Sequence, residues 1–137
     1  PAILRSSGNP HCCLVLRGGN VSGPNFGAAA VNDALQRLQD AGLEAGLVVD
    51  CSHGNSNKDH RNQPLVAEDL ACQIEGGSTT IAGIMLESHL VEGSQSVTAG
   101  RAACYGQSIT DACIDWETTV RVLDRLAAAV RRRRELR

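Results

Sequence analysis

The stretch "AGLVVDCSHGNSNK", residues 45 to 58, runs from an apolar segment directly into an acid, a thiol, a hydroxyl and an imidazole. Its first part, residues 45 to 51, is nearly continuous in apolar side chains, a pattern typical of a strand that is buried on both faces of a parallel sheet. The Gly-Asn-Ser-Asn that follows His53 is turn-forming. The stretch therefore predicts a buried strand that places a histidine at the edge of a sheet.

Two further apolar runs match this pattern, "CCLVL" at residues 12 to 16 and "IAGIML" at residues 81 to 86. Amphipathic helical patterns occupy residues 27 to 41 and 64 to 75, and a last helix is predicted from Asp115, as its N-cap, to the C-terminal arginines. Strands that alternate with helices indicate a parallel sheet. We therefore predict an α/β fold of about three βα units.

The composition is that of an ordinary globular domain: 137 residues, 42% apolar and 20% charged, with a formal net charge of −2. This charge predicts no binding of nucleic acid or anionic membranes. No stretch approaches the roughly 18 apolar residues of a membrane span. Residues 1 to 11 lack the apolar core of a signal peptide and an initiator Met, so we expect a cytoplasmic protein whose sequence begins upstream.

The only basic run, residues 131 to 134, has two interpretations. A helix C-terminus favours cations because its free carbonyl groups carry partial negative charge. We therefore prefer a solvated helix end over a patch that binds polyanions.

The six cysteines lie mostly inside apolar runs and lack the dense spacing of a disulfide framework, so we expect reduced thiols. We interpret Cys12, Cys13, Cys72 and Cys113 as small buried apolar groups. A small metal or redox protein built on the cysteines is a weak alternative, because no CxxC spacing is present.

Polar residues follow all three predicted strands where each strand ends. Arg17, which precedes two glycines, follows the first strand, His53 follows the second, and Glu87 follows the third. The carboxyl ends of parallel strands lie on one face of such folds, where ligands bind. A guanidinium, an imidazole and a carboxylate gathered there predict a site for a phosphorylated ligand and a metal ion.

A strand period of two places Cys51 and His53 on one face and Asp50 and Ser52 on the other. Two residues along a strand span roughly 6.6 Å, so we expect Cys51 to contribute to packing rather than to approach a metal. Taken alone, a strand-end histidine such as His53 is either a ligand or merely hydrogen-bonded, and the residues leave both roles open.

The other histidines carry weaker signals. His89, two residues beyond Glu87, would point the same way if the strand continued and would then support the site. His11 and His60 have the surroundings of surface residues. Lys58, in the loop after His53, either meets an anion or is simply solvated.

The segment 88–114 is rich in Gly and Ser and has no clear periodicity, and a loop of this length is usually functional or disordered. Asp111 lies near its end, just before the last helix. This aspartate either caps a turn or faces inward as a second carboxylate ligand.

Four long polar motifs extend this argument beyond single residues. In the same order and at matching spacing, they closely resemble the first (type I) family of 3-deoxy-arabino-heptulosonate 7-phosphate (DAHP) synthases: "LRGG" at 16–19, "SHGNSNK" at 52–58, "ESHLVEGSQS" at 87–96 and "YGQSITDACIDWE" at 105–117. The resemblance implies a (β/α)8 TIM barrel, of which residues 1–137 would form a C-terminal segment within one domain. That segment would carry strands six to eight and would be incomplete as a barrel.

The resemblance also implies roles for individual residues. His53, Glu87 and Asp111 would be catalytic metal ligands, Arg17 would bind phosphoenolpyruvate, and Asp111 would also lie against substrate. The family's fourth ligand is a cysteine from the N-terminal half, which these residues do not include. Such a mixed ligand set accepts manganese, iron, cobalt or zinc, and the sequence does not say which.

The reaction that the resemblance implies joins phosphoenolpyruvate to D-erythrose 4-phosphate, giving DAHP and phosphate, the first step of the shikimate route to chorismate and the aromatic amino acids. The complete enzyme would be a homo-oligomer, and this chain without the N-terminal barrel half would be inactive. The alternative is a non-catalytic fragment or regulatory partner of a barrel half. The sequence leaves open which aromatic amino acid inhibits the enzyme.

Overall fold

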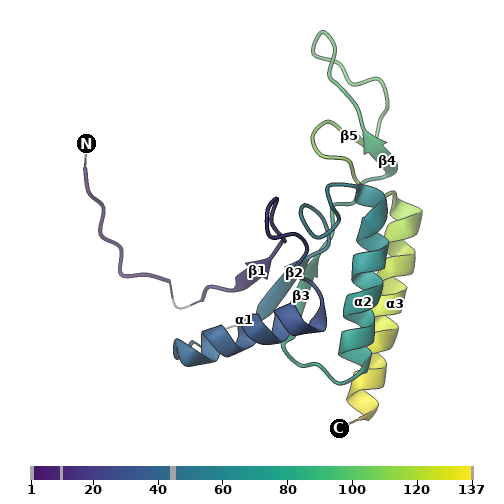
Figure 1. Ribbon diagram of the computed structural model, residues 1–137. Coiled ribbons are helices and arrows are strands. Elements are labelled where there is room, and N and C mark those ends of the chain that lie inside the picture. The colour runs from purple at the N-terminus through teal and green to yellow at the C-terminus, as the bar shows by residue number, and fades with distance from the viewer. Residues whose placement is uncertain (1, 10, 44–45, 137) are drawn as a thin grey trace.

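The computed structural model describes residues 2–9, 11–43 and 46–136. Three strands form a parallel sheet in the order β1-β2-β3, and each strand is followed by a helix further along the chain (Figure 1). The elements are β1 (Leu14–Leu16), α1 (Ala28–Asp40), β2 (Leu47–Asp50), α2 (Gln63–Glu75), β3 (Ile81–Met85) and α3 (Trp116–Glu135). The α/β prediction with three βα units is therefore confirmed.

The strands are shorter than the apolar runs that predicted them. β1 lacks residues 12 and 13, β2 ends at Asp50, and residue 45 of the second predicted run lies outside the described residues. The helices agree with their predicted ranges to within about one residue. Asp115 is the N-cap of α3, because its carboxylate accepts a hydrogen bond of 2.7 Å from the amide of Thr118.

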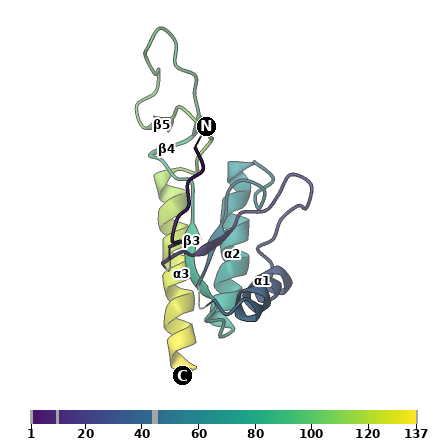
Figure 2. The ribbon, with the colours of Figure 1, turned by 90° about the vertical axis from the view of Figure 1, so that its left-hand side faces the viewer.

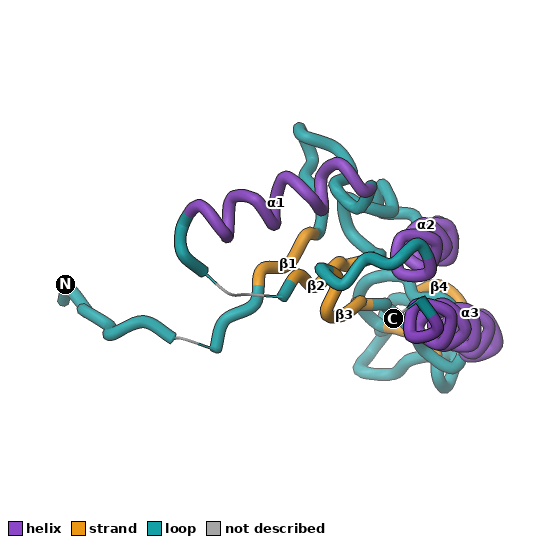
Figure 3. The backbone as a smooth tube through the Cα atoms, turned by 90° about the horizontal axis from the view of Figure 1, so that it is seen from below, coloured by secondary structure: helices purple, strands orange, loops and turns teal. Residues whose placement is uncertain are grey.

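The apolar core lies between the sheet and the helices. Leu16, Val49 and Ile84 are neighbours across the three strands, and they join one cluster with buried residues of the helices, among them Val31 and Leu70. α1 and α2 cover one side of the sheet, and α3 packs beside α2 (Figure 3). Within the described residues, helices therefore pack against only one face of these apolar strands.

In the described part of the chain, no helix covers the opposite side of the sheet and no strand pairs with its outer edges (Figure 3). Val15 of β1 is exposed, and Met85 of β3 is 46% exposed. Within the described residues, neither β1 nor β3 pairs with a further strand of this sheet. The sheet is open, and both of its edges keep unpaired backbone groups.

The segment 88–114 contains more regular structure than the sequence predicted. β4 (Val91–Ser94) and β5 (Gln107–Ser108) pair in parallel. Residues 88–114, hereafter the excursion, extend beyond the carboxyl end of the main sheet (Figure 2). Gln95 braces this excursion, because its side chain contacts the backbone of both Cys104 and Gln107.

Our prediction that most cysteines are buried is wrong. Cys12, Cys13 and Cys72 are exposed and Cys113 is partly exposed, whereas Cys51 is fully buried. The first two precede β1 and are not covered by any element of the described part of the chain. Cys72 lies on the outer surface of α2, where its thiol is 3.6 Å from a guanidinium nitrogen of Arg125.

The basic run at residues 131–134 lies in the last turns of α3, largely in solvent, as expected of a helix end. Among the residues described, no helix combines the length and apolar character needed to cross a membrane.

Candidate metal centre

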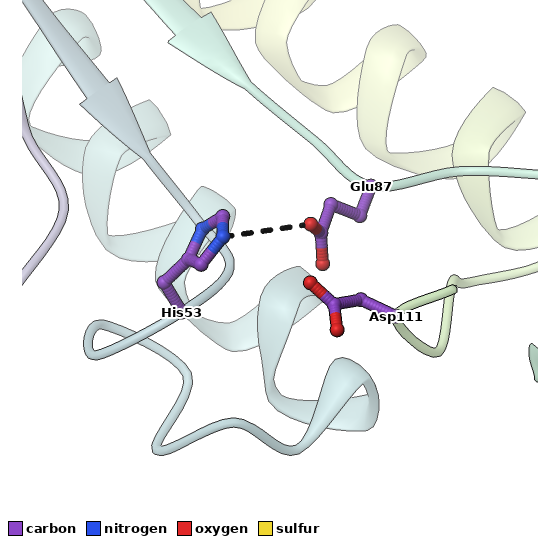
Figure 4. A group of neighbouring side chains, drawn as sticks. All are labelled: His53, Glu87 and Asp111. Atoms are coloured by element: carbon purple, nitrogen blue, oxygen red, sulfur yellow. Dashed lines mark ion pairs between the residues drawn. The ribbon is translucent and has the colours of Figure 1, made fainter.

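Three side chains from different strand exits meet at the carboxyl end of the sheet: His53, Glu87 and Asp111 (Figure 4). One potential ligand atom from each lies within 4.8 Å of the other two. His53 Nε2 is 3.7 Å from Glu87 Oε1. The convergence that the sequence predicted is present in the structure.

The spacing of these atoms is close to that of a metal site. Two metal–ligand bonds of about 2.0–2.2 Å place their ligand atoms no more than about 4.4 Å apart. The His53–Glu87 pair, at 3.7 Å, is within this limit, and the 4.8 Å bound on the three atoms exceeds it only slightly. The exposed carboxylate of Asp111 can close this difference by rotating about its side-chain bonds. An imidazole and two carboxylates are suitable donors for a divalent first-row metal ion.

His53 reaches the site through a turn rather than along a strand. β2 ends at Asp50, and His53 has a left-handed backbone with φ of 51°. The predicted strand period of two therefore does not apply, and Cys51 does not share a face with His53. Burial, reinforced by the charge of Asp50, raises the pKa of the Cys51 thiol to about 12, so this sulfur packs as an apolar group.

Asp50 contacts His53, and the sequence analysis did not predict this contact. Its carboxylate is buried, and its Oδ2 is 2.7 Å from Nδ1 of His53. Ser52 completes the cluster by donating its amide hydrogen to Oδ1 of Asp50 at 2.8 Å. Asp50, three residues before His53 in the sequence, could have indicated this contact. The prediction of a continuous strand instead placed the two side chains on opposite faces.

Glu87 follows β3 and is held by its backbone. Its amide donates to Oε1 of Gln63 at 2.8 Å, and its carbonyl accepts from Nε2 of the same side chain and from the amide of Ile114. Burial raises the pKa of the Glu87 carboxyl, with the charge of Asp111 adding to the effect and the charge of His53 opposing it.

Asp111 is an exposed residue of the excursion. The N-cap of α3 is Asp115 rather than Asp111, and Asp111 lies beside Glu87 in the same cluster. The structure thus favours the inward-facing interpretation of Asp111 over the capping interpretation.

Arg17 lies on the rim of a cavity of about 370 Å³ that the three candidate ligands also line. The glycines beside it allow two loops to approach closely, because a Cβ atom on Gly18 would lie 2.6 Å from the Gly54 carbonyl carbon. Lys58, the loop lysine with two open interpretations, also lines the cavity.

The remaining histidines differ from one another. His11 is exposed, as predicted. His60, predicted as a surface residue, instead lines the cavity and forms a 2.9 Å contact with Glu92. The condition on which His89 would support the site is not met, since β3 ends at Met85. His89 is exposed and accepts a hydrogen bond from the next amide.

The fold and site define an α/β unit with a parallel sheet, in which a histidine and a carboxylate from two strand exits meet a second carboxylate from residues 88–114 in a set suited to a divalent metal. Comparison with known proteins specifies the family. The model of the DAHP synthetase I family matches residues 2–124, and the chain belongs to this family.

Named relatives agree with this assignment. The chain is 49% identical to phospho-2-dehydro-3-deoxyheptonate aldolase AMT16 of Alternaria alternata, over 98% of this chain and 36% of that protein. It is 48% identical to the Phe-sensitive phospho-2-dehydro-3-deoxyheptonate aldolase of Escherichia coli K12, over 97% of this chain and 37% of that protein.

A solved structure shows the same similarity in three dimensions. It is a phospho-2-dehydro-3-deoxyheptonate aldolase from Francisella tularensis SCHU S4, with a TM-score of 0.87 and 45% identity, covering 96% of this chain and 38% of that one. The chain thus spans little more than a third of the length of the relatives that it matches.

Proposed function

We propose that these residues form the C-terminal part of a type I DAHP synthase and that the complete natural protein containing them, hereafter the complete protein, condenses phosphoenolpyruvate with D-erythrose 4-phosphate to give DAHP and phosphate. Family membership and the names of the relatives support this reaction class. The convergence of the three candidate ligands at the strand exits is the single observation that carries the proposal.

Residues 1–137 contribute the last three βα units of a closed (β/α)8 barrel in this proposal. The uncovered side of the sheet, which includes Val15 and Met85, would face the barrel interior. The unpaired edges of β1 and β3 would each pair with a strand of the preceding barrel half. The share of the relatives that the chain covers supports this division.

His53, Glu87 and Asp111 would hold the divalent metal ion, whose identity among manganese, iron, cobalt and zinc their chemistry does not decide. When bound, the metal acts as a Lewis acid that polarises the aldehyde of erythrose 4-phosphate for attack by phosphoenolpyruvate, a weak carbon nucleophile. The three side chains fix the place where this aldehyde is presented.

Arg17 would bind the phosphate or carboxylate of phosphoenolpyruvate. Its planar guanidinium can form two parallel hydrogen bonds to either group. Asp111, which also lines the cavity, would lie against substrate as well as the metal. Arg17 and Asp111 would thereby hold substrate at the metal site.

The alternative is a non-catalytic association partner of a barrel half. The uncovered sheet edges favour it, since unpaired strands recruit other chains. Turnover separates the two functions: the complete protein should release phosphate from the two substrates only when a divalent metal is present, and residues 1–137 alone should release none. A complete protein that is inactive with each of the four metals would refute the proposed synthase.

A further inference from the structure

Buried polar side chains lie directly behind the candidate metal ligands, and the proposed function gives them no role. Asp50 is 2% exposed and Gln63 is fully buried. Burying a carboxylate or an amide is costly unless its polar atoms are paired. Each residue pairs at least one side-chain polar atom with a candidate ligand, Asp50 with His53 and Gln63 with Glu87.

Asp50 is held rigidly before it meets the histidine. Its Oδ1 accepts hydrogen bonds from both the amide and the hydroxyl of Ser52. Its Oδ2 then remains for Nδ1 of His53, at 2.7 Å. Because the hydroxyl hydrogen of Ser52 is donated to Asp50, the Ser52 oxygen, also 2.7 Å from Nδ1, can only accept. Both neighbours therefore favour a hydrogen on Nδ1.

A hydrogen on Nδ1 leaves the lone pair of a neutral imidazole on Nε2. Nε2 is the atom that faces Glu87, at 3.7 Å from its Oε1. The backbone of His53 is left-handed, which is unfavourable for a residue with a side chain, and its carbonyl is held by the amide of Lys58 at 2.8 Å. The surroundings thus determine both the direction of the ring and its tautomer.

We propose that Asp50 is a positioning residue that fixes His53 in the Nδ1–H tautomer, with Nε2 aimed at the metal. This inference rests on the proposed metal site. It extends that proposal to a residue that contacts neither the metal nor the substrates.

The test substitutes Asp50→Asn in the complete protein and measures the dissociation constant of Zn²⁺ by competition with a chromophoric chelator. The Asn oxygen can still accept from the amide of Ser52, but its NH₂ group then faces Nδ1 and favours the opposite tautomer. Loss of such an outer partner typically lowers metal affinity about 10–100-fold, which is the expected result. The visible spectrum of bound Co²⁺ should change as well.

Asp115→Asn is the matched control, because Asp115 also accepts a backbone amide but lies at the start of α3. It should bind Zn²⁺ like the unmodified protein. Unchanged affinity and an unchanged Co²⁺ spectrum in Asp50→Asn would overturn the inference. If that variant does not fold, a neutron structure of the metal-free, unmodified protein decides: deuterium on Nδ1 supports the inference, and deuterium on Nε2 alone refutes it.

The same titration separates the inference from the proposed function. If His53→Ala removes tight Zn²⁺ binding and Asp50→Asn does not weaken it, only the role of Asp50 is wrong. If the unmodified protein binds no metal at this site, the proposed metal site and the role of Asp50 are both wrong.

A second observation independently concerns Gln63, the first residue of α2. Its side-chain amide forms two hydrogen bonds to a single residue, accepting from the amide of Glu87 at 2.8 Å and donating to its carbonyl at 3.1 Å. We infer that this amide clamp sets the direction in which Glu87 leaves the sheet. Gln63 is therefore a positioning residue for the second ligand.

Gln63→Glu keeps the acceptor and removes the donor, and it should weaken Zn²⁺ binding by about tenfold or more. Gln73→Glu in the same helix is the control, because Gln73 donates to the carbonyl of Phe26 and neither residue lines the cavity of the candidate ligands. Equal Zn²⁺ affinities in the two variants would refute the inference. If Gln63→Glu does not fold, hydrogen exchange of the Glu87 amide decides: slow exchange supports the clamp, and exchange at the rate of an open loop refutes it.

Discussion

The exit of β2 and the excursion at residues 88–114 both deliver a candidate ligand to the same cavity, but they do so in different ways. At the β2 exit, His53 is braced by buried polar residues, including Asp50 and Asn55. Asn55 joins two strand ends, because its side-chain amide donates to the carbonyl groups of Leu16 and Asp50. This side of the site is fixed before any ligand binds.

The excursion presents Asp111 in a different setting. Asp111 is exposed, and so are the nearby Tyr105 and Ile109, so little apolar burial stabilises this part of the chain. Its order comes from polar contacts such as those of Gln95 and from the short pairing of β4 with β5. We call the β2 exit with His53 the rigid wall of the cavity and the excursion with Asp111 the adaptable wall. The rigid wall should contribute more to metal affinity.

Substitution at the rigid wall should have the largest effect. In the complete protein, His53→Ala removes the imidazole and should lower metal-dependent kcat by roughly 10³-fold or more, since Lewis-acid stabilisation contributes several kcal/mol. Far-ultraviolet circular dichroism should stay unchanged. Activity that survives His53→Ala without added metal would contradict the ligand assignment.

Substitution at the adaptable wall should have a smaller effect. Asp111→Asn keeps the shape of the side chain and removes its charge, and we expect an approximately 10–100-fold loss of metal affinity. Competition titration with Zn²⁺ measures this loss directly. If Asp111→Asn and His53→Ala weaken metal binding equally, the distinction between the two walls is wrong.

Arg17→Lys tests a third residue that lines the cavity. The charge remains, but the planar pair of donors is lost, so KM for phosphoenolpyruvate should rise by about tenfold while metal affinity stays constant. Steady-state kinetics at saturating erythrose 4-phosphate provide the measurement. An unchanged KM would mean that Arg17 does not bind this substrate.

The smallest effect should come from Asp115→Ala, which removes the N-cap of α3 without touching the cavity. Loss of a cap should lower the thermal midpoint of the complete protein by about 2 °C. Zn²⁺ affinity should not change. A marked loss of Zn²⁺ affinity would show that the position of α3 controls the adaptable wall.

The sequence predicted the elements of the fold well, because apolar runs and helical periodicity report burial directly. β2 and β3 lie within their predicted runs, and α1 agrees with its predicted helix to within about one residue at each end. It predicted burial of Cys12 less well, because an apolar run implies burial only where neighbouring elements cover it. Among the residues that the structure describes, no element covers the start of β1.

The sequence predicted which strand ends carry candidate site residues, but it did not predict the contacts between their side chains. Placing Arg17, His53 and Glu87 at one end of a parallel sheet needs only topology. The contact between Asp50 and His53 depends on where β2 ends and on the left-handed backbone conformation of His53. The clamp from Gln63 depends on a helix start lying beside a strand exit, which no local pattern encodes.

The most direct test is a crystal structure of the complete protein grown with Mn²⁺, with anomalous diffraction used to locate the ion. One strong anomalous peak within bonding distance of His53 Nε2 and of carboxylate oxygens of Glu87 and Asp111 is the expected result. A manganese ion bound elsewhere, with these three side chains free of metal, would contradict the account.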